Sequence, residues 1–304
     1  MKIQAEMRPT NSLIWQILLA EEVTMMIGAL WRGASGMRAQ QVQVDSLAND
    51  IANVNTTGYK QVRVGFSDLV YRPVMEAGMP VEQPQAPGST VSLGTGVKVA
   101  SIVKDFSQGA LVQTGEPLNL AIQGEGFFAV VNGAGERFLT RDGNFHRDAD
   151  GNVVNDGGYY LAIPAGNNQD VPLNLPPEAE NINVAADGTI TATVNGQVQP
   201  LGQIYLYTVS NPAGLEAVGD NLYRLTPACG QLFYGAPGTA GNSETTGTPG
   251  PVLGTLRSGY LEAANVDLAA TMTRMVVAQR AYELNSRTIR VADEMWSLAN
   301  NLRR

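Results

Sequence analysis

The stretch SLANDIANVNTTGYK, residues 46–60, joins a helical pattern to a turn. Leu47, Ile51 and Val54 fall at helical spacing, and Gly58 suits the left-handed turn that follows a helix end. Three asparagines lie among these apolar positions, and no typical catalytic group accompanies them. The stretch therefore predicts the end of a helix whose polar groups are amides.

An apolar stripe extends this helix upstream, and we expect it to cover residues 27–54. The stripe recurs every seven residues, with a further position three residues later: Leu30, Met37, Val44, Leu47 and Ile51. Such a heptad repeat is typical of helices that pack along a seam.

The C-terminal end carries a matching pattern. Its apolar stripe recurs every seven residues: Leu268, Met275, Tyr282, Ile289 and Trp296. A second row lies three residues later in each heptad and is mostly small: Thr271, Ala278, Asn285, Ala292 and Ala299. Asn265 is a good N-cap, and neither Pro nor Gly interrupts the chain from there to residue 304. The pattern predicts a second long helix.

Between these helices the apolar period changes to two. Residues 189–194 alternate threonine with apolar side chains, and Asp-Gly and Asn-Gly pairs on either side predict hairpin turns. Further strand candidates are residues 97–102, 127–131, 159–163 and 204–209. The Pro-rich residues 73–92 and the Gly-, Thr- and Pro-rich residues 235–254 predict extended or flexible connections. We expect an α+β fold with a β-rich central body, in which the terminal helices pair as a coiled-coil-like domain.

Composition excludes several classes of protein. The chain has 304 residues, a net charge of −8 and no run of basic residues beyond Arg303-Arg304, so we expect no nucleic-acid partner. Cys229 is the single cysteine, which excludes an internal disulfide and a cysteine-based zinc site. The apolar run at residues 13–20 is too short to cross a bilayer, so we expect no membrane insertion. An ordinary turn-rich soluble protein fits the composition equally well.

No enzyme or cofactor motif fits its required context. His146, the single histidine, lies in a polar turn and is expected at the surface, and the calcium-loop alignment around it lacks acidic residues at both ends. Residues 124–129 (GEGFFA) match a loose dinucleotide-binding pattern, but a strand-like run follows where a helix is needed. A carboxylate pair for glycoside hydrolysis stays open, although nothing points to one. We expect no enzyme, no cofactor and no metal.

The heptad seams allow two interpretations. They fit an internal hairpin packed on the β body, and they also fit packing between copies of the chain. The helices occupy both chain ends and carry many amides, which hydrogen-bond across an interface without the desolvation cost of a charge. Repeated contacts that do not close would build a helical filament.

Several motifs resemble, in order, the signatures of bacterial flagellar rod and hook proteins. They are residues 46–60, QGEGFF (123–128), TRDGNF (140–145), GYLEAANVD (259–267) and QRAYELNS (279–286). Asp50 stands where that family usually has Asn. NPAGLE (211–216) and GDNLY (219–223) are particularly like the distal rod members of the family. The resemblance begins near residue 26, and we expect residues 1–25 to be an extension from an early start codon, with Met25 and Met26 as alternative starts.

The resemblance implies a structural axial protein with no enzymatic activity. Members of the distal rod type leave through the flagellar export apparatus and polymerise in the periplasm into a hollow tube that transmits torque. The implied partners are further copies of the chain in a helical tube, proximal rod and hook proteins, and the bushing rings. Residues expected in helical assembly are the stripe residues Leu30, Met37, Val44, Leu47, Ile51, Leu268, Met275, Tyr282, Ile289 and Trp296, together with Asn53.

The resemblance also implies a division into domains. Residues 26–60 and 262–304 would form the terminal helical domain, residues 61–120 and 228–261 an extended connecting domain, and residues 121–227 an outer β-rich domain. The Pro-rich residues 73–92 lie where distal rod proteins carry a stretch associated with a straight, stiff rod, although a plain loop is the alternative. Rival interpretations are a proximal rod or hook protein, a periplasmic cell-wall enzyme and an adhesin-like protein.

Overall fold

The computed structural model describes residues 10–73, 92–164, 170–194, 196–244 and 247–302, with side chains from residue 27 onward except at residues 299 and 302. The chain divides into two compact units. Residues 1–49, 62–103 and 269–304 form the first, here called the helical unit. Residues 50–61 and 104–268 form the second, here called the β unit.

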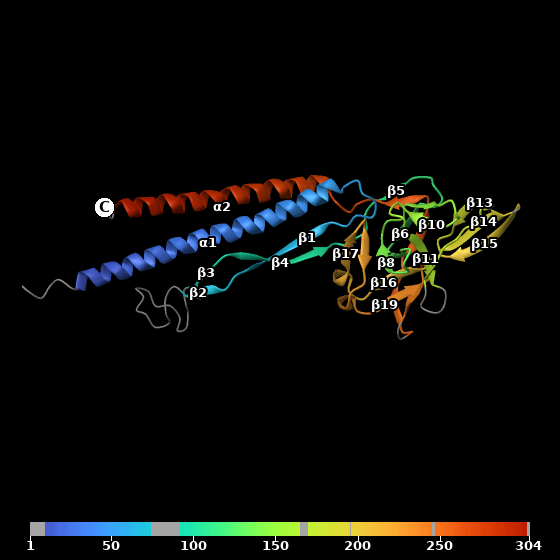
Figure 1. The fold of residues 1–304 in the computed structure, drawn as a ribbon, viewed down its shortest axis with the longest axis horizontal. Coiled ribbons are helices and arrows are strands. Elements are labelled where there is room, and N and C mark those ends of the chain that lie inside the picture. The colour runs from blue at the N-terminus through green and yellow to red at the C-terminus, as the bar shows by residue number, and fades with distance from the viewer. Residues whose placement is uncertain (1–9, 74–91, 165–169, 195, 245–246, 303–304) are drawn as a thin grey trace, which may run out of the picture. The chain divides into compact units, whose positions relative to one another are not determined.

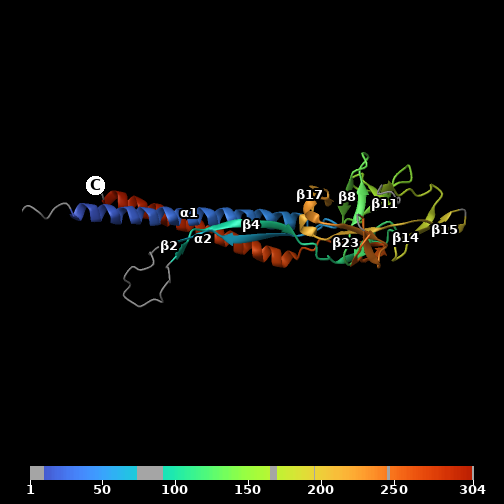
Figure 2. The same ribbon diagram turned by 90° about the horizontal axis from the view of Figure 1, so that it is seen from below.

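Two long helices dominate the helical unit. These are α1 (Thr10–Ala52) and α2 (Leu268–Leu302), which run side by side in opposite directions (Figures 1 and 2). The expected pair of helices is therefore confirmed. Helix α1 begins well before the predicted residue 27, because the apolar run at residues 13–20 continues the helix instead of preceding it.

Short strands accompany these helices. They are β1 (Val62–Asp68), β2 (Tyr71–Pro73), β3 (Ser92–Gly94) and β4 (Val97–Lys104). Strand β1 pairs with β4, and β2 pairs antiparallel with β3 in a register that sets Pro73 opposite Ser92. The ends of the Pro-rich stretch are therefore held together in a ladder, whereas its residues 74–91 lie outside the described part of the chain.

Antiparallel sheets make up the β unit. Its strands are β5 (Leu111–Gln113), β6 (Leu120–Gln123), β7 (Phe128–Val131), β8 (Arg137–Thr140), β9 (Phe145–Arg147), β10 (Val153–Asn155), β11 (Tyr160–Pro164), β12 (Asp170–Pro172), β13 (Glu180–Val184), β14 (Thr189–Val194), β15 (Gln197–Gln203), β16 (Leu206–Val209), β17 (Glu216–Gly219), β18 (Leu222–Arg224), β19 (Leu232–Gly235), β20 (Ala240–Ser243), β21 (Pro249–Val252), β22 (Thr255–Ser258) and β23 (Tyr260–Glu262). Single 3-10 turns lie at η1 (Pro212–Gly214) and η2 (Pro227–Cys229). The largest sheet has the order β17-β18-β8-β7-β11-β10-β9, with β12 paired to β11.

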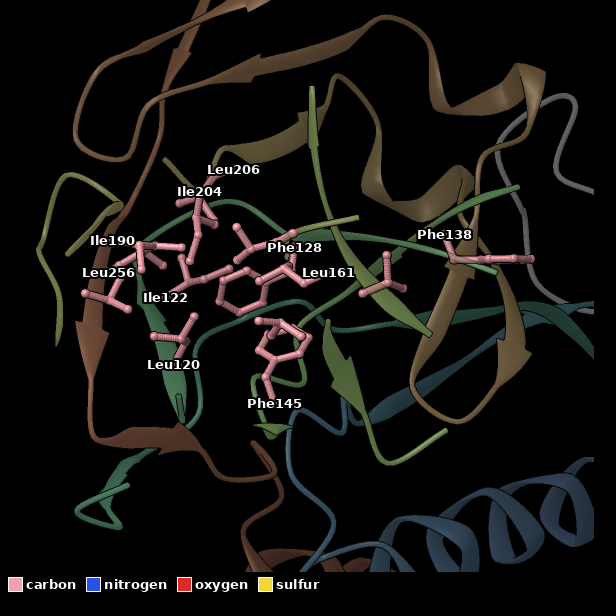
Figure 3. Close-up of a cluster of buried hydrophobic side chains, with 14 of the residues drawn as sticks. Leu120, Ile122, Phe128, Phe138, Phe145, Leu161, Ile190, Ile204, Leu206 and Leu256 are labelled. Atoms are coloured by element: carbon pink, nitrogen blue, oxygen red, sulfur yellow. The ribbon is translucent and has the colours of Figure 1, made fainter. Parts of the chain in front are cut away.

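Strand β7 explains why the β unit has two cores. Side chains of a strand alternate between its faces, so Phe128 and Val130 enter one buried cluster while Ala129 and Val131 enter another. Because both faces are covered, the run FFAVV is apolar throughout instead of alternating with polar residues. Figure 3 shows the first cluster, in which the Phe128 and Phe145 rings meet edge to face at 5.4 Å between centroids.

The predicted hairpin around residues 189–194 is confirmed. Strand β14 pairs antiparallel with both β13 and β15. Gly188 and Gly196 adopt φ angles of +84° and +79°, the left-handed conformation that tight turns assign to glycine.

The prediction of a loose connection at residues 235–254 is wrong. Strands β20 and β21 lie within it and join the sheet β16-β19-β20-β21. Glycine at position 250 lets the backbone approach the Phe233 ring, since a Cβ there would lie 2.3 Å from ring atom Cδ1. Gly250 therefore serves close packing between strands, although the composition around it resembled that of a linker.

Candidate assembly surfaces

The predicted seam residues of helix α1 differ in how deeply they are buried. Leu47 is fully buried, whereas the other apolar positions of the stripe are half-buried: Leu30, Met37, Val44 and Ile51. Asn53 is half-buried too, and its Oδ1 accepts a hydrogen bond from the Thr56 hydroxyl at 3.2 Å. This hydrogen bond lies within the turn at the end of α1. A local role of this kind is one of the two that the sequence allows for the amides.

The fully buried positions of α2 are its small residues. Thr271, Ala278 and Ala292 are buried, while Met275 and Ile289 are half-buried. The remaining predicted stripe residues are exposed, namely Leu268, Tyr282 and Trp296. The buried seam is therefore centred on the row three residues later than the large apolar one.

Two glycines of α1 allow a close contact with α2. A Cβ at Gly33 would lie 2.8 Å from Ile289 Cγ1, and one at Gly36 would lie 2.7 Å from Asn285 Nδ2. Two helices can approach this closely only where one of them lacks side chains. Ile289 and Asn285 of α2 therefore occupy the space that side chains at Gly33 and Gly36 would fill.

This arrangement leaves an apolar stripe of α2 uncovered within the described chain. Val277, Leu284, Val291 and Leu298 recur every seven residues and expose 63%, 63%, 46% and 64% of their surface. We call these four residues the α2 outer stripe. The sequence contains this third heptad row, but our prediction assigned the seam to the row that includes Tyr282 and Trp296 and did not consider it.

A buried charge cluster lies inside the β unit, and the sequence analysis did not anticipate it. Glu262 Oε1 accepts hydrogen bonds from Lys60 Nζ at 2.7 Å and from the Gly109 amide at 2.8 Å. Glu262 Oε2 accepts one from Arg141 Nη1 at 3.4 Å. The three charged side chains expose 4% of their surface or less. Burial lowers the pKa of Lys60 and of Arg141, while the Glu262 carboxylate opposes both shifts.

The other sequence candidates fall as follows. His146 is exposed as predicted, 3.7 Å from Asp156 Oδ1. The GEGFFA stretch runs into strand β7, not into a helix, as the sequence indicated. Asn265 is not the N-cap, because α2 begins at Leu268 and the Asn265 side chain instead accepts a hydrogen bond from the Gln61 amide at 2.7 Å.

Metal and membrane features give little guidance. Within the described ranges, no three or more His, Cys, Asp or Glu side chains gather where they could hold a metal ion. No helix in that part of the chain combines the length and the apolar character needed to span a bilayer.

Comparison with known proteins addresses the identity of the chain. Three family models match it: "Flagella basal body rod protein" at residues 32–60, "Flagellar hook protein FlgE/F/G D1 domain" at residues 121–192 and "Flagellar basal body rod FlgEFG protein C-terminal" at residues 257–302. The flagellar basal-body rod protein FlgG of Borreliella burgdorferi is 38% identical over 284 residues, which cover 92% of this chain and all of that protein.

The chain belongs to the FlgG family of flagellar basal-body rod proteins. FlgG of Caulobacter vibrioides is 38% identical over 90% of this chain and 99% of its own length. FlgG of Bacillus subtilis is 35% identical over 92% of this chain and its own full length. As a FlgG-family protein the chain has a structural, axial role in the rod of the flagellar basal body. The charged residues of the buried cluster are distributed one to each of the three matched segments.

Proposed function

We propose that this chain polymerises through its helical unit into the distal part of the flagellar rod, a hollow shaft that passes torque to the hook. The uncovered α2 outer stripe is the observation that carries the proposal. Soluble monomers rarely leave a row of large apolar side chains in water, and a heptad row matches the seam of helix–helix packing. In the polymer, this row would lie against helices of neighbouring copies.

The small row and the outer stripe of α2 then have different roles. The small residues near α1 hold the helices of one copy together, and the outer stripe binds the next copy. The exposed seam residues Leu268, Tyr282 and Trp296 lie on nearly the opposite side of α2 from the outer stripe and would contact a different neighbour, and the buried Leu47 belongs to the inner contact. Regular coiled-coil packing and the contribution of Leu30, Met37, Val44, Ile51, Met275 and Ile289 are parts of the same proposal.

A heterologous contact fits a shaft better than a closed dimer. The outer stripe lies on α2 alone, whereas the corresponding exposed face of α1 begins with Ile27 and Trp31 and continues with Arg38, Gln41 and Asp45. Two different faces that meet head to tail repeat without closing, which generates a helical assembly.

The proposed partners follow from this position in the rod. They are further copies of the chain, proximal rod and hook proteins at the two ends, the bushing rings around the shaft and the export apparatus that delivers the chain. A purely structural role needs no catalytic group. A paralogous place in the proximal rod or hook is the alternative, and a periplasmic cell-wall enzyme is the alternative of another class.

Imaging of basal bodies tests the assignment. Deleting the gene should leave truncated rods without hooks in electron micrographs, and expression of the full chain should restore both. A form that starts at Met26 should restore them equally if residues 1–25 are an extension. Intact hook-basal bodies in the deletion strain would contradict the proposal and favour a paralogous or enzymatic role.

Two further proposals concern residues whose role in assembly is untested. Replacing Asn53 by Leu should spare export but impair swimming if the amide packs between copies; normal rods would limit it to the local bond with Thr56. Deleting residues 74–91 should produce curved rods if that stretch docks on neighbouring copies, whereas straight rods would indicate a plain loop.

A further inference from the structure

After it enters the β unit at Asp50, the chain crosses the boundary of that unit at three further places. It leaves after Gln61, returns at Lys104 and leaves again after Leu268. These three segments are far apart in sequence, since more than forty residues separate the first two and more than 160 separate the last two. Every force that the β unit exchanges with the rest of the chain through covalent bonds crosses one of them or the entry.

Hydrogen bonds tie the three segments to one another inside the β unit. The Asp105 amide donates to the Gln61 carbonyl at 2.8 Å, which joins the first segment to the second. The Asn265 side chain joins the third to both, because it accepts from the Gln61 amide at 2.7 Å and donates to the Asp105 carbonyl at 2.8 Å.

Glu262 repeats this pattern with charge. Its carboxylate binds Lys60 of the first segment and the Gly109 amide just beyond the second, at 2.7 Å and 2.8 Å. Lys60 in turn donates to the Ser107 carbonyl at 2.8 Å, and the Glu262 carbonyl accepts from the Gly58 amide at 2.8 Å. Arg141, at the end of β8, approaches the second carboxylate oxygen and stacks over the Phe127 ring at 5.3 Å.

We propose that Lys60, Glu262 and Asn265, anchored to the β sheet by Arg141, form an exit clamp that fixes the paths of all three connecting segments relative to one another. Charges this deeply buried are a poor means of adding stability, because their desolvation offsets much of their attraction. Their geometric demands, however, select one arrangement of the segments that carry them. As part of the rod proposed above, such a clamp would make the connection to the β unit stiff under torque.

The rival explanation is a general contribution to β-unit stability. The two explanations predict that loss of the Glu262 carboxylate loosens different parts of the β unit. A clamp, once broken, frees the connecting segments while the sheet stays closed, and a general stabiliser loosens the sheet equally. Amide hydrogen exchange separates these cases, because it reports opening segment by segment.

The test is hydrogen exchange with mass spectrometry on the purified full chain, comparing wild type with Glu262→Gln. We expect exchange at least about tenfold faster in peptides that contain the Gln61, Asp105 and Gly109 amides, and unchanged exchange in β7 and β8. Glu244→Gln is the matched control. It removes the charge of another largely buried carboxylate, one that pairs with Arg137 at 2.9 Å within the β unit. It should leave the three segments at wild-type rates.

Two further variants keep the test decisive. Lys60→Met removes one cation, and Asn265→Ala removes the neutral bonds without changing any charge; each should accelerate the same peptides. Wild-type protection of these segments in a folded variant would overturn the proposal. Equal acceleration of β7 and β8, including complete unfolding in all three variants, would also overturn it in favour of a general stabiliser.

Swimming then tests the mechanical part, which rests on the proposed function. A strain with Asn265→Ala should build rods and hooks of normal length and yet swim more slowly in viscous medium than a Glu244→Gln strain. Equal swimming would overturn the mechanical role of the clamp. Loss of rods in the gene deletion is a separate readout, so failure of the clamp and failure of the rod assignment are distinguishable.

Discussion

The two units of this chain treat their apolar residues in opposite ways. In the β unit, two buried clusters meet across strand β7, and side chains such as Phe128 and Leu139 have no exposed surface. In the helical unit, the residues buried along α2 are small, and Leu284 and Leu298 expose more than 60% of their surface. The β unit has a core of its own, whereas the helical unit leaves apolar side chains of α2 exposed, which the proposed rod would bury. If the proposal holds, one chain combines a unit that packs by itself with a unit whose packing is completed by other copies.

The largest expected effect separates assembly from folding. Leu284→Asp places a charge in the α2 outer stripe and should abolish rods and swimming, because burying an unpaired carboxylate between helices is prohibitive. Thermal unfolding of the β unit in the purified variant should match wild type. Val198→Asp is the control, since Val198 is also an exposed aliphatic residue, at 72%, but lies on β15. Normal swimming with Leu284→Asp would break the comparison.

Truncations to alanine sharpen the same contrast in the isolated chain. Phe128→Ala should cost about 3–5 kcal/mol of unfolding free energy, because it opens a cavity in a fully buried cluster. Leu284→Ala should cost less than about 0.5 kcal/mol, as is usual for surface positions. Denaturant titration followed by far-UV circular dichroism measures the unfolding free energy of both variants. Comparable losses for the two variants would mean that the outer stripe is already packed within one copy.

Two buried tyrosines provide a finer test inside the β unit. The Tyr207 hydroxyl lies 3.2 Å from Asp170 Oδ1, whereas the Tyr223 hydroxyl has no hydrogen-bond partner among the described residues. Tyr207→Phe should therefore cost about 1.5 kcal/mol, and Tyr223→Phe should be neutral or slightly stabilising. Chemical denaturation at neutral pH compares the pair, and a loss for Tyr223→Phe as large as that for Tyr207→Phe would contradict it.

The same pair predicts behaviour in alkali. Burial raises the pKa of Tyr223 above its ordinary value of 10.0. The folded form keeps its proton where the unfolded form loses it, so this contribution to stability is complete below pH 10 and is lost as pH rises beyond it. Relative to wild type, Tyr223→Phe should gain stability as pH increases above that value. A difference that does not change with pH would show that the Tyr223 pKa is not raised.

The smallest expected effect concerns the contact between the two helices. Alanine usually stabilises a helix relative to glycine by up to about 1 kcal/mol. At Gly33 the added Cβ would meet Ile289, so Gly33→Ala should instead destabilise the helix pair by about 1 kcal/mol. At Gly28 the nearest atoms belong to the flexible Arg32 side chain, so Gly28→Ala should stabilise it. Helical circular dichroism on heating measures the difference, and equal shifts would argue against close helix contact.

Local patterns predicted much of this fold. Heptad spacing gave both helices, and alternating threonines gave strand β14 with its glycine turns. The glycine-rich residues 235–254 misled us, because the packing of Gly250 on Phe233 depends on a tertiary contact that composition does not reveal. The prediction that Asn265 caps a helix failed for the same kind of reason. Its hydrogen bonds to Gln61 and Asp105 join residues far apart in sequence, and a local pattern does not reveal them.

Prediction of the site was less complete. Several heptad rows occur on α2, and their spacing alone does not show that the row with Thr271, Ala278 and Ala292 is the buried one. The exit clamp was invisible for a different reason. Lys60 and Glu262 are 202 positions apart, and the residues around each of them predict only a charged side chain at the surface.

Labelling of an introduced cysteine tests the central claim most directly, namely that the α2 outer stripe is covered by other copies in the rod. Cys229 is buried and gives little background. Leu284→Cys and the control Val198→Cys should both react quickly with a maleimide in the purified chain. In isolated basal bodies the account predicts that the cysteine at position 284 is protected from the maleimide. The cysteine at position 198 should still react quickly there. Equally rapid labelling at position 284 in the chain and in intact rods would contradict the account.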